Sequence, residues 1–198
     1  MISLSQQPID LHAYRRDRGG APAGAEFPEA VRRLPRGVSV ISFGAGDERF
    51  GLTATSVSSL SLDPPTILVS VNRESPFFRE FLRSRSFGVS VLAGGHDALA
   101  DRFSGGAQIP EAERRRDDVW AASASGVPLL VEAVAAFDCE QDDTMECHGY
   151  AVVVGRVRSV RAPGGSSALV YWRGAYNQLG WTEDEISRAV GLSPNGAR

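Results

Sequence analysis

The sequence predicts a mainly β protein, an antiparallel barrel with a few short flanking helices. About seven segments of alternating or continuous apolar residues, separated by turns rich in Gly and Pro, have the length and composition of strands. Helical spacing occurs in only two to four short segments, and these do not alternate with the strands as they would around a parallel sheet. A chain of 198 residues with 42% hydrophobic content is long enough for one domain with a substantial core.

Composition excludes several classes of function. The net charge is −3 and every basic side chain other than histidine is Arg, so the sequence predicts no nucleic-acid or membrane partner. Without Lys, neither a Schiff-base nor a P-loop lysine mechanism is available. Cys139 and Cys147 flank a polar segment, an arrangement in which they could face each other across a hairpin, and we expect two reduced thiols. No apolar run approaches membrane-spanning length, and we expect a cytoplasmic protein.

The first part of the chain divides into an arm and the start of the folded domain. Residues 1–26 are polar and rich in Gly, Ala and Pro, which predicts a flexible N-terminal arm. The domain is expected over residues 27–180. It begins with a helix that carries Phe27, Ala30, Val31 and Leu34 at helical spacing. A strand over residues 38–43 and a hairpin turn over 44–47 lead into a strand over 49–56.

The middle of the chain continues with strands and short helices. A strand over residues 66–71 precedes a turn in which Ser75 is expected to cap a helix and Pro76 to start it. The free N–H groups of that helix suit a phosphate, and the alternative interpretation is a helix cap with no ligand. Further elements are a strand over 87–92, a helix over 97–103, a surface loop or partly helical excursion over 107–118, and strands over 133–140, 150–160 and 168–172. Residues 181–198 are expected to form a C-terminal helix and tail, with a capping box at 182–185.

One stretch, residues 51–65, combines strand character with many hydroxyl side chains and ends in Pro64-Pro65. We call it the hydroxyl-rich segment. Small side chains let a flat or anionic ligand approach the backbone, and Ser, Thr and N–H groups can hold phosphate or ring carbonyls. It therefore predicts a ligand-binding surface; the alternative is a Ser/Thr-rich strand on a solvated sheet face.

Few residues are suited to acid–base or metal chemistry. No G-x-G-x-x-G follows a strand and opens a helix, which disfavours a Rossmann dehydrogenase, and there is no G-x-S-x-G elbow. With only His12, His96 and His148, a Ser-His-Asp hydrolase or a multi-histidine metal site is poorly supplied. Such a chain suits a reaction whose electron chemistry belongs to a cofactor.

The chain resembles the flavin reductase-like, FMN-binding split-barrel family over residues 27–179. The resemblance is carried, in order and spacing, by the hydroxyl-rich segment, Ser75-Pro76 and residues 87–92, 99–104, 126–129 and 154–157. It implies a split β-barrel, FMN or FAD as cofactor and NADH or NADPH as co-substrate. It also implies a homodimer whose second subunit completes the site, and a flavin-dependent monooxygenase as partner.

The resemblance also assigns flavin-binding residues. Along the flavin ring, ribityl chain and phosphate, the hydroxyl-rich segment supplies Thr53, Ala54, Thr55, Ser56, Val57, Ser59 and Leu60. The turn near the phosphate supplies Glu74, Ser75 and Pro76, and a second flavin-contacting loop supplies Phe103, Ser104 and Gly105. Arg79 and Arg102 are candidate phosphate partners because a guanidinium forks onto phosphate oxygens. The alternative for either arginine is a solvated surface residue.

The family segment associated with the nicotinamide side of the site is matched by Tyr171, Trp172, Arg173 and Gly174. An Arg beside two aromatic rings suits a dinucleotide, because the Arg can hold a phosphate while a ring stacks on the nicotinamide or adenine. The alternative is a barrel-closing strand with a buried Trp172. The sequence departs from the family where many relatives have Gly-Asp-His, since Tyr150 occupies the position of that histidine. His148 lies two residues earlier and is expected on the same strand face, because side chains two residues apart in a strand point to the same side. The candidate catalytic residues are therefore His148 and Tyr150.

The resulting functional hypothesis is an NAD(P)H:flavin oxidoreductase that supplies reduced FMN or FAD to a monooxygenase. Two alternatives stay open at this point. One is a split-barrel flavoprotein that retains its flavin and transforms its own organic substrate, and the other is a non-enzymatic flavin-binding protein.

Overall fold

The computed structural model describes residues 24, 26–46, 48–114, 119–163 and 167–181. The chain divides into two units between Val31 and Arg32. Helix α1 (Glu26–Arg32) accounts for nearly all of the described part of the first unit, and everything else below belongs to the second. The expected N-terminal arm, up to residue 23, and the expected C-terminal helix after residue 181 lie outside the described residues.

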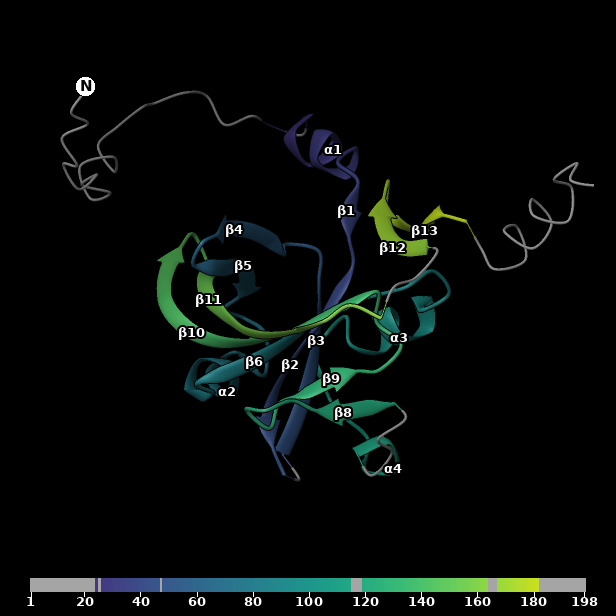
Figure 1. The fold of residues 1–198 in the computed structure, drawn as a ribbon. Coiled ribbons are helices and arrows are strands. Elements are labelled where there is room, and N and C mark those ends of the chain that lie inside the picture. Colours follow the sequence, from purple (N-terminus) through teal and green to yellow (C-terminus); the bar gives the residue numbers. More distant parts are fainter. Residues whose placement is uncertain (1–23, 25, 47, 115–118, 164–166, 182–198) are drawn as a thin grey trace, which may run out of the picture. The chain divides into compact units, whose positions relative to one another are not determined.

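An eight-stranded antiparallel sheet forms the barrel (Figure 1). Its strand order is β4-β5-β11-β10-β6-β2-β3-β7, so neighbours in sequence are often neighbours in space, as in hairpin-connected β proteins. In Figure 1, β10 and β11 are one long, strongly curved hairpin. The strands are β2 (Ser39–Ala45), β3 (Glu48–Ala54), β4 (Ser58–Leu62), β5 (Pro65–Asn72), β6 (Ser86–Val91), β7 (Ala107–Gln108), β10 (Ala135–Cys147) and β11 (Tyr150–Arg161).

Two smaller sheets and three helices make up the rest of the second unit as far as the structure describes it. A three-stranded sheet has the order β1-β12-β13, and a two-stranded sheet pairs β8 with β9. An isolated bridge between Ala93 and Ala168 joins the end of β6 to the three-stranded sheet. The elements are β1 (Arg36–Gly37), β8 (Trp120–Ala122), β9 (Pro128–Leu130), β12 (Ser167–Trp172), β13 (Ala175–Gly180), α2 (Phe78–Arg83), α3 (Asp97–Arg102) and α4 (Glu111–Arg114).

The core consists of two apolar clusters. One lies around Trp120, Leu92 and Phe103, and the other around Phe43, Phe81 and Phe87. In the second cluster, Phe81 packs edge-on against both Phe43 and Phe87, with ring centroids 5.3 and 5.5 Å away. Aromatic pairs at these separations add to the stabilisation from buried area. The alternation of buried and exposed residues in the strands arises because successive side chains point to opposite faces.

The β10–β11 hairpin changes its exposure along its length. Its register shifts at two irregularities, between Asp138 and Cys139 and between Gln141 and Asp143, and such bulges bend a strand.

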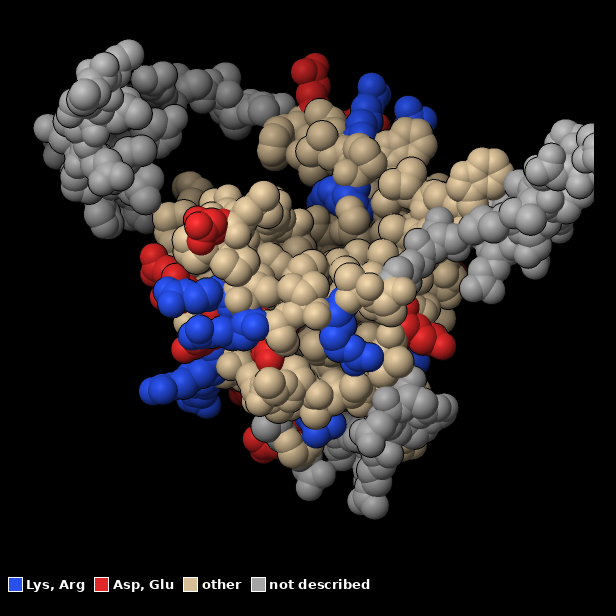
Figure 2. All heavy atoms as spheres, viewed as in Figure 1, with Lys and Arg blue, Asp and Glu red and all other residues tan. Residues whose placement is uncertain are grey.

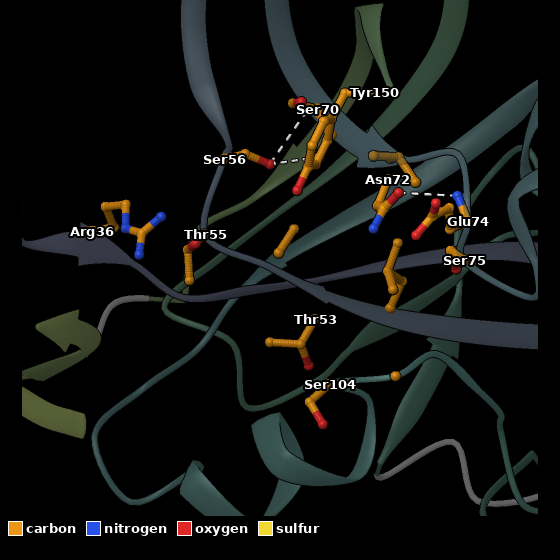
Figure 3. Close-up of a pocket in the computed structure, with 14 residues that line it drawn as sticks. Arg36, Thr53, Thr55, Ser56, Ser70, Asn72, Glu74, Ser75, Ser104 and Tyr150 are labelled. Atoms are coloured by element: carbon orange, nitrogen blue, oxygen red, sulfur yellow. Dashed lines mark hydrogen bonds between the residues drawn. The ribbon is translucent and has the colours of Figure 1, made fainter. Parts of the chain in front are cut away.

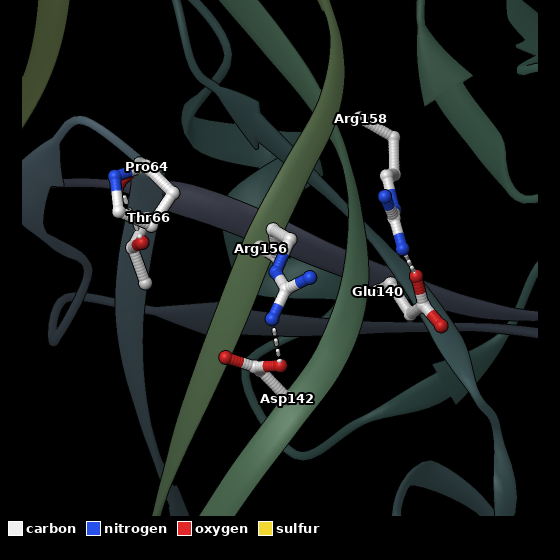
Figure 4. A network of polar contacts seen from close by, with 6 residues as sticks. All are labelled: Pro64, Thr66, Glu140, Asp142, Arg156 and Arg158. Atoms are coloured by element: carbon white, nitrogen blue, oxygen red, sulfur yellow. Dashed lines mark hydrogen bonds and ion pairs between the residues drawn. The ribbon is translucent and has the colours of Figure 1, made fainter.

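On the exposed surface of this hairpin, Arg156 Nη2 lies 2.6 Å from Asp142 Oδ1, and Arg158 pairs with Glu140 (Figure 4). Near them, at the β4–β5 turn, Thr66 Oγ1 donates to the carbonyl of Pro64 at 2.8 Å. Exposed ion pairs of this kind add little stability and mainly keep the hairpin surface polar.

Charge is mixed on the face of the molecule that Figure 2 shows. Figure 2 shows blue and red side chains interspersed around a broad uncharged area, with no extended field of one sign on this face. Among the described residues, no helix is long and apolar enough to cross a membrane.

The predicted fold class, a mainly β antiparallel split barrel, is confirmed, but three local predictions were wrong. Ser75 does not cap α2, which begins at Phe78 with Phe77 as its N-cap residue. His148 is not in a strand: His148 and Gly149 form the turn between β10 and β11, with φ of 46° and 82°. Cys139 and Cys147 are both free, as expected, but they lie on the same strand, β10, and not across a hairpin.

Candidate functional site: a hydroxyl-lined cavity

A cavity of about 480 Å³ lies where the ends of several strands meet (Figure 3). This volume is within the range of small-molecule sites, roughly 300–1,000 Å³. Eight of its fourteen lining residues carry a hydroxyl or amide group, whereas only Arg36 and Glu74 carry a full charge. The lining residues are Arg36, Leu52, Thr53, Ala54, Thr55, Ser56, Ser70, Val71, Asn72, Glu74, Ser75, Ser104, Gly105 and Tyr150.

The end of β3 is joined to the turn after α3. The Thr53 N–H donates to the carbonyl of Phe103 at 2.8 Å, and the Thr53 hydroxyl donates to the carbonyl of Ala100 at 2.7 Å. Ser104 caps the same turn by donating to the carbonyl of Asp101 at 2.8 Å. These bonds fix Ser104 and Gly105 against the strand, so two separate segments line one side of the cavity.

The loop between β3 and β4 is held against β5 by one serine. The Ser56 hydroxyl donates to the carbonyl of Ser70 at 2.7 Å, and the Ser70 N–H lies 3.3 Å from the Ser56 oxygen (Figure 3). The side chain thus replaces a pair of backbone ladder bonds where the hydroxyl-rich segment leaves the sheet. Part of the hydroxyl enrichment in this segment is therefore structural.

The third wall is the turn after β5. Asn72 Oδ1 accepts from the Glu74 N–H at 2.9 Å, and the Asn72 carbonyl accepts from the Ser75 N–H at 3.1 Å. Asn72 also pairs with Tyr150 in the β5–β11 ladder, which brings the tyrosine to the same wall. In Figure 3 the side chains of Tyr150, Asn72 and Glu74 gather at this side of the cavity.

Some polar groups in the lining are left for a ligand. The Ser75 hydroxyl oxygen is buried and has no hydrogen-bond partner among the described residues. The Thr55 side chain also makes no hydrogen bond within the described part of the chain, and it lies at the opposite side of the cavity in Figure 3. A buried hydroxyl without a partner costs free energy, roughly 1–3 kcal/mol, which a ligand that bonds to it would recover.

Two groups with raised pKa values lie outside the cavity. Burial, and then the neighbouring Asp138 carboxylate, raise the pKa of the Cys139 thiol to about 12. Burial, and then the Asp101 carboxylate, raise the pKa of the Tyr176 hydroxyl. Neither residue lines the cavity, and among the described residues there is no cluster of three or more potential metal ligands.

Nine of the predicted site residues line the cavity together: Thr53, Ala54, Thr55, Ser56, Glu74, Ser75, Ser104, Gly105 and Tyr150. Several others do not. Val57 is half-buried against the second core cluster, Ser59 and Leu60 are exposed on β4, and Pro76 is exposed beside the α2 start. Phe103 is fully buried in the first core cluster, with its ring 6.0 Å from that of Trp120.

The two predicted phosphate arginines also lie outside the lining. Arg79 is exposed on α2. Arg102 forms an ion pair with Glu113, which also accepts from Trp120 Nε1 at 3.2 Å. Neither guanidinium lines the cavity, and their role in binding phosphate stays a prediction.

The predicted nicotinamide segment forms the β12–β13 hairpin, outside the cavity lining. Arg173 and Gly174 are its two turn residues, with φ of 52° and 84°. The guanidinium of Arg173 lies over the Trp172 ring, 4.6 Å from its centroid, and Trp172 is 39% exposed, so it is not the buried tryptophan of the alternative interpretation. Tyr171 packs edge-on against Tyr176 at 5.5 Å.

Sequence reasoning missed five lining residues: Arg36, Leu52, Ser70, Val71 and Asn72. Asn72 carried a signal, because an Asn directly after a strand often forms the side-chain turn seen here. Arg36 carried none, since the pairing of β1 with β12 brings it to the cavity from another sheet.

Comparison with known proteins agrees with this architecture. A family model described as a flavin reductase like domain matches residues 31–180, and the chain belongs to this family. The chain is 33% identical over 171 residues to "FMN reductase (NADH) RutF 2" of Methylorubrum extorquens, covering 86% of this chain and 91% of that protein.

Two solved structures give the same result. BorF, the flavin reductase component of a bacterial two-component tryptophan halogenase, is 31% identical with a TM-score of 0.71, over 79% of this chain and 98% of BorF. The styrene monooxygenase flavin reductase SMOB of Pseudomonas putida S12 is 27% identical with a TM-score of 0.67, over 79% of this chain and 99% of SMOB.

Proposed function

We propose that this protein is an NADH-dependent flavin reductase that uses FMN. The observation that carries the proposal is the cavity itself, which combines hydroxyl and amide groups with almost no charged groups and lies within the matched family domain. The name of the Methylorubrum extorquens relative supports FMN and NADH in particular.

The residues present fit a flavin. The unpartnered Ser75 hydroxyl and the Thr55 hydroxyl are free to bond the carbonyl or phosphate oxygens of such a ligand, and the small residues Ala54 and Gly105 allow a flat ring to approach the backbone. Bound flavin supplies the electron chemistry, accepting a hydride from NADH and a proton from water to give NAD⁺ and reduced flavin. The chain binds and orients the two reactants.

Tyr150 is the best-placed candidate to position the nicotinamide. Its side chain lines the cavity and is 48% exposed, so it is not committed to the core. His148 lies in the turn before it and outside the lining. In this proposal Tyr150 keeps the nicotinamide in position relative to the flavin, because a misplaced hydride donor loses the alignment needed for reaction.

The same proposal implies that reduced flavin is supplied to a partner enzyme. The names of BorF and SMOB describe reductases that serve a halogenase and a monooxygenase, which supports a flavin-dependent monooxygenase as the consumer of reduced flavin here. We place the protein in the cytoplasm, a compartment with NADH and one that suits two free cysteines.

We also propose a homodimer. β4 is an edge strand of the barrel, and it exposes Leu60 by 57% and Leu62 by 91%. An exposed edge with large apolar side chains is a typical association surface. Light scattering tests this, because a fully active monomer would contradict it.

Anaerobic mixing with NADH and excess FMN tests the function. We expect rapid loss of the oxidised flavin absorbance, many turnovers per protein, and reduced flavin that passes through an ultrafilter. Bleaching of one equivalent that stays bound would favour a flavoprotein with its own substrate. Absence of bleaching with NADH and with NADPH would contradict a reductase and leave a flavin-binding protein. Substituting FAD and NADPH in turn ranks the two flavins and the two nicotinamides.

A further inference from the structure

Arg36 enters the cavity from β1 and is held there by an aromatic ring. In the β1–β12 pairing Arg36 is directly opposite Tyr171. Its guanidinium carbon lies 5.7 Å from the centroid of the Tyr171 ring, which in turn packs against Tyr176. A guanidinium over an aromatic face is a favourable and orienting contact. Figure 3 shows the Arg36 side chain extending from its strand toward Thr55.

Within the part of the chain that the structure describes, no acidic group compensates the charge of Arg36. Arg36 Nε is buried without a hydrogen-bond partner, and among the described residues Arg36 has no ion-pair partner. Glu74, the other charged residue of the lining, lies across the cavity beside Asn72 and Ser75 in Figure 3. Since a guanidinium stays charged and a partly buried charge without a partner is costly, the site favours an anionic ligand group at the Arg36 side.

We propose that Arg36 binds a phosphate group of the ligand. The inference rests on the proposed function, in which phosphate comes from two sources, FMN and the nicotinamide dinucleotide. It assigns the role that sequence reasoning gave to Arg79 and Arg102, neither of which lines the cavity. A guanidinium presents two parallel N–H donors to phosphate oxygens, and the free Nε–H of Arg36 is one of them.

The test compares ligands that differ only in phosphate. Calorimetric titrations measure the affinity of FMN and of riboflavin for the wild type, for Arg36→Gln and for Arg36→Lys. Loss of a charge-assisted contact corresponds to about a tenfold to hundredfold change. If the flavin phosphate binds at Arg36, Arg36→Gln lowers FMN affinity by that factor and leaves riboflavin affinity nearly unchanged. Arg36→Lys keeps the positive charge but lacks the two parallel N–H donors, so its FMN affinity falls between those of the wild type and Arg36→Gln.

The second source is tested by kinetics. If the dinucleotide phosphate binds at Arg36, both flavin affinities stay unchanged in Arg36→Gln and the KM for NADH rises by the same factor. Arg161→Gln is the matched control, because Arg161 is exposed at the end of β11 and outside the cavity. Thermal unfolding checks that each variant is folded.

Two outcomes overturn the inference. If Arg36→Gln leaves the ratio of FMN to riboflavin affinity and the KM for NADH at wild-type values, Arg36 binds no phosphate and the proposed function stands without it. If the wild type binds neither flavin and oxidises no NADH, the proposed function itself fails, and this inference fails with it.

Discussion

Tyr150 stands opposite Asn72 in the β11–β5 ladder, at the point where one strand begins and the other ends. Both residues line the cavity. The two-residue turn before Tyr150 and the Asn72 turn meet there, since the Arg73 N–H donates to the carbonyl of Gly149 at 3.0 Å. This bond fixes the position of Tyr150 along the ladder relative to the Glu74–Ser75 turn. Backbone contacts on both strands therefore hold Tyr150 in place.

We expect Tyr150→Ala to lower the rate of flavin reduction by about tenfold to a hundredfold, because a slightly misplaced donor loses reactive geometry. Flavin affinity should stay nearly unchanged, since the hydroxyl-rich segment is intact. Tyr150→Phe, which keeps the ring, should retain most of the rate. Anaerobic stopped-flow reduction across an NADH titration separates the rate from the binding of NADH.

The control for this prediction is His148→Asn, because Asn tolerates the positive φ of 46° at that turn position. We expect the wild-type rate, since His148 does not line the cavity. A reduced rate in His148→Asn with a normal rate in Tyr150→Ala would reverse the assignment. Normal rates in both variants would show that this hairpin does not contact the nicotinamide.

Gly51 tests the packing that supports the cavity. A Cβ at Gly51 would lie 2.6 Å from a ring carbon of Phe103, which is fully buried. Gly51→Ala should therefore destabilise the fold by about 1–3 kcal/mol. It should also weaken flavin binding, because the Phe103 backbone carries the turn to Ser104 and Gly105. Denaturant unfolding gives the stability, and adding Phe103→Leu should restore part of it by making room. No loss of stability in Gly51→Ala would contradict the packing.

Cys139 gives a pH-dependent prediction. Its pKa is raised from 9.0 to about 12 in the folded state, so above pH 9 the unfolded chain loses this proton first. The folded state then binds more protons, and the free energy of unfolding falls as pH rises from about 9 to 12. Cys139→Ala should remove this part of the decline, which urea unfolding at several pH values measures. A steeper decline in the variant than in the wild type would contradict the sign.

The same burial predicts thiol reactivity. At neutral pH the exposed Cys147 should react with an alkylating reagent, whereas the buried Cys139 should react only after unfolding. Mass spectrometry of the labelled protein before and after denaturation distinguishes the two thiols. Equal labelling of both in the folded protein would contradict the burial of Cys139.

The sequence predicted the longer strands because alternation and β-branched residues are local signals. It missed β1, β7, β8 and β9, which have two or three residues each, too few to show a period. It predicted no separate strand for β4 or β13, of five and six residues, whose side chains are mostly exposed. It also misread the β10–β11 turn. His148 followed by Gly149 is a hairpin signal of the Asn-Gly kind, but the two-residue spacing to Tyr150 led us to place His148 on the same strand face as Tyr150.

The same contrast between local signals and long-range pairing explains which residues of the candidate site were predicted. Residues contiguous in sequence, such as 53–56 and Ser104-Gly105, were found because each lies in one recognisable stretch. Ser70 and Arg36 were not, since they reach the cavity through the pairing of β5 with its neighbours and of β1 with β12. Long-range strand pairing of this kind has no local signal. Conversely, Phe103 and Val57 belong to matching stretches, but their side chains pack into the core.

The most direct test of the account is whether flavin occupies the cavity. Thr55→Trp places a large ring in the cavity, where a small side chain now stands, and Ser159→Trp places the same ring on the exposed end of β11 as a control. Calorimetric titration with FMN should show no binding to Thr55→Trp and wild-type affinity for Ser159→Trp, with both variants folded by circular dichroism. Wild-type FMN affinity in Thr55→Trp would contradict the central claim, because the flavin would then bind elsewhere on the protein.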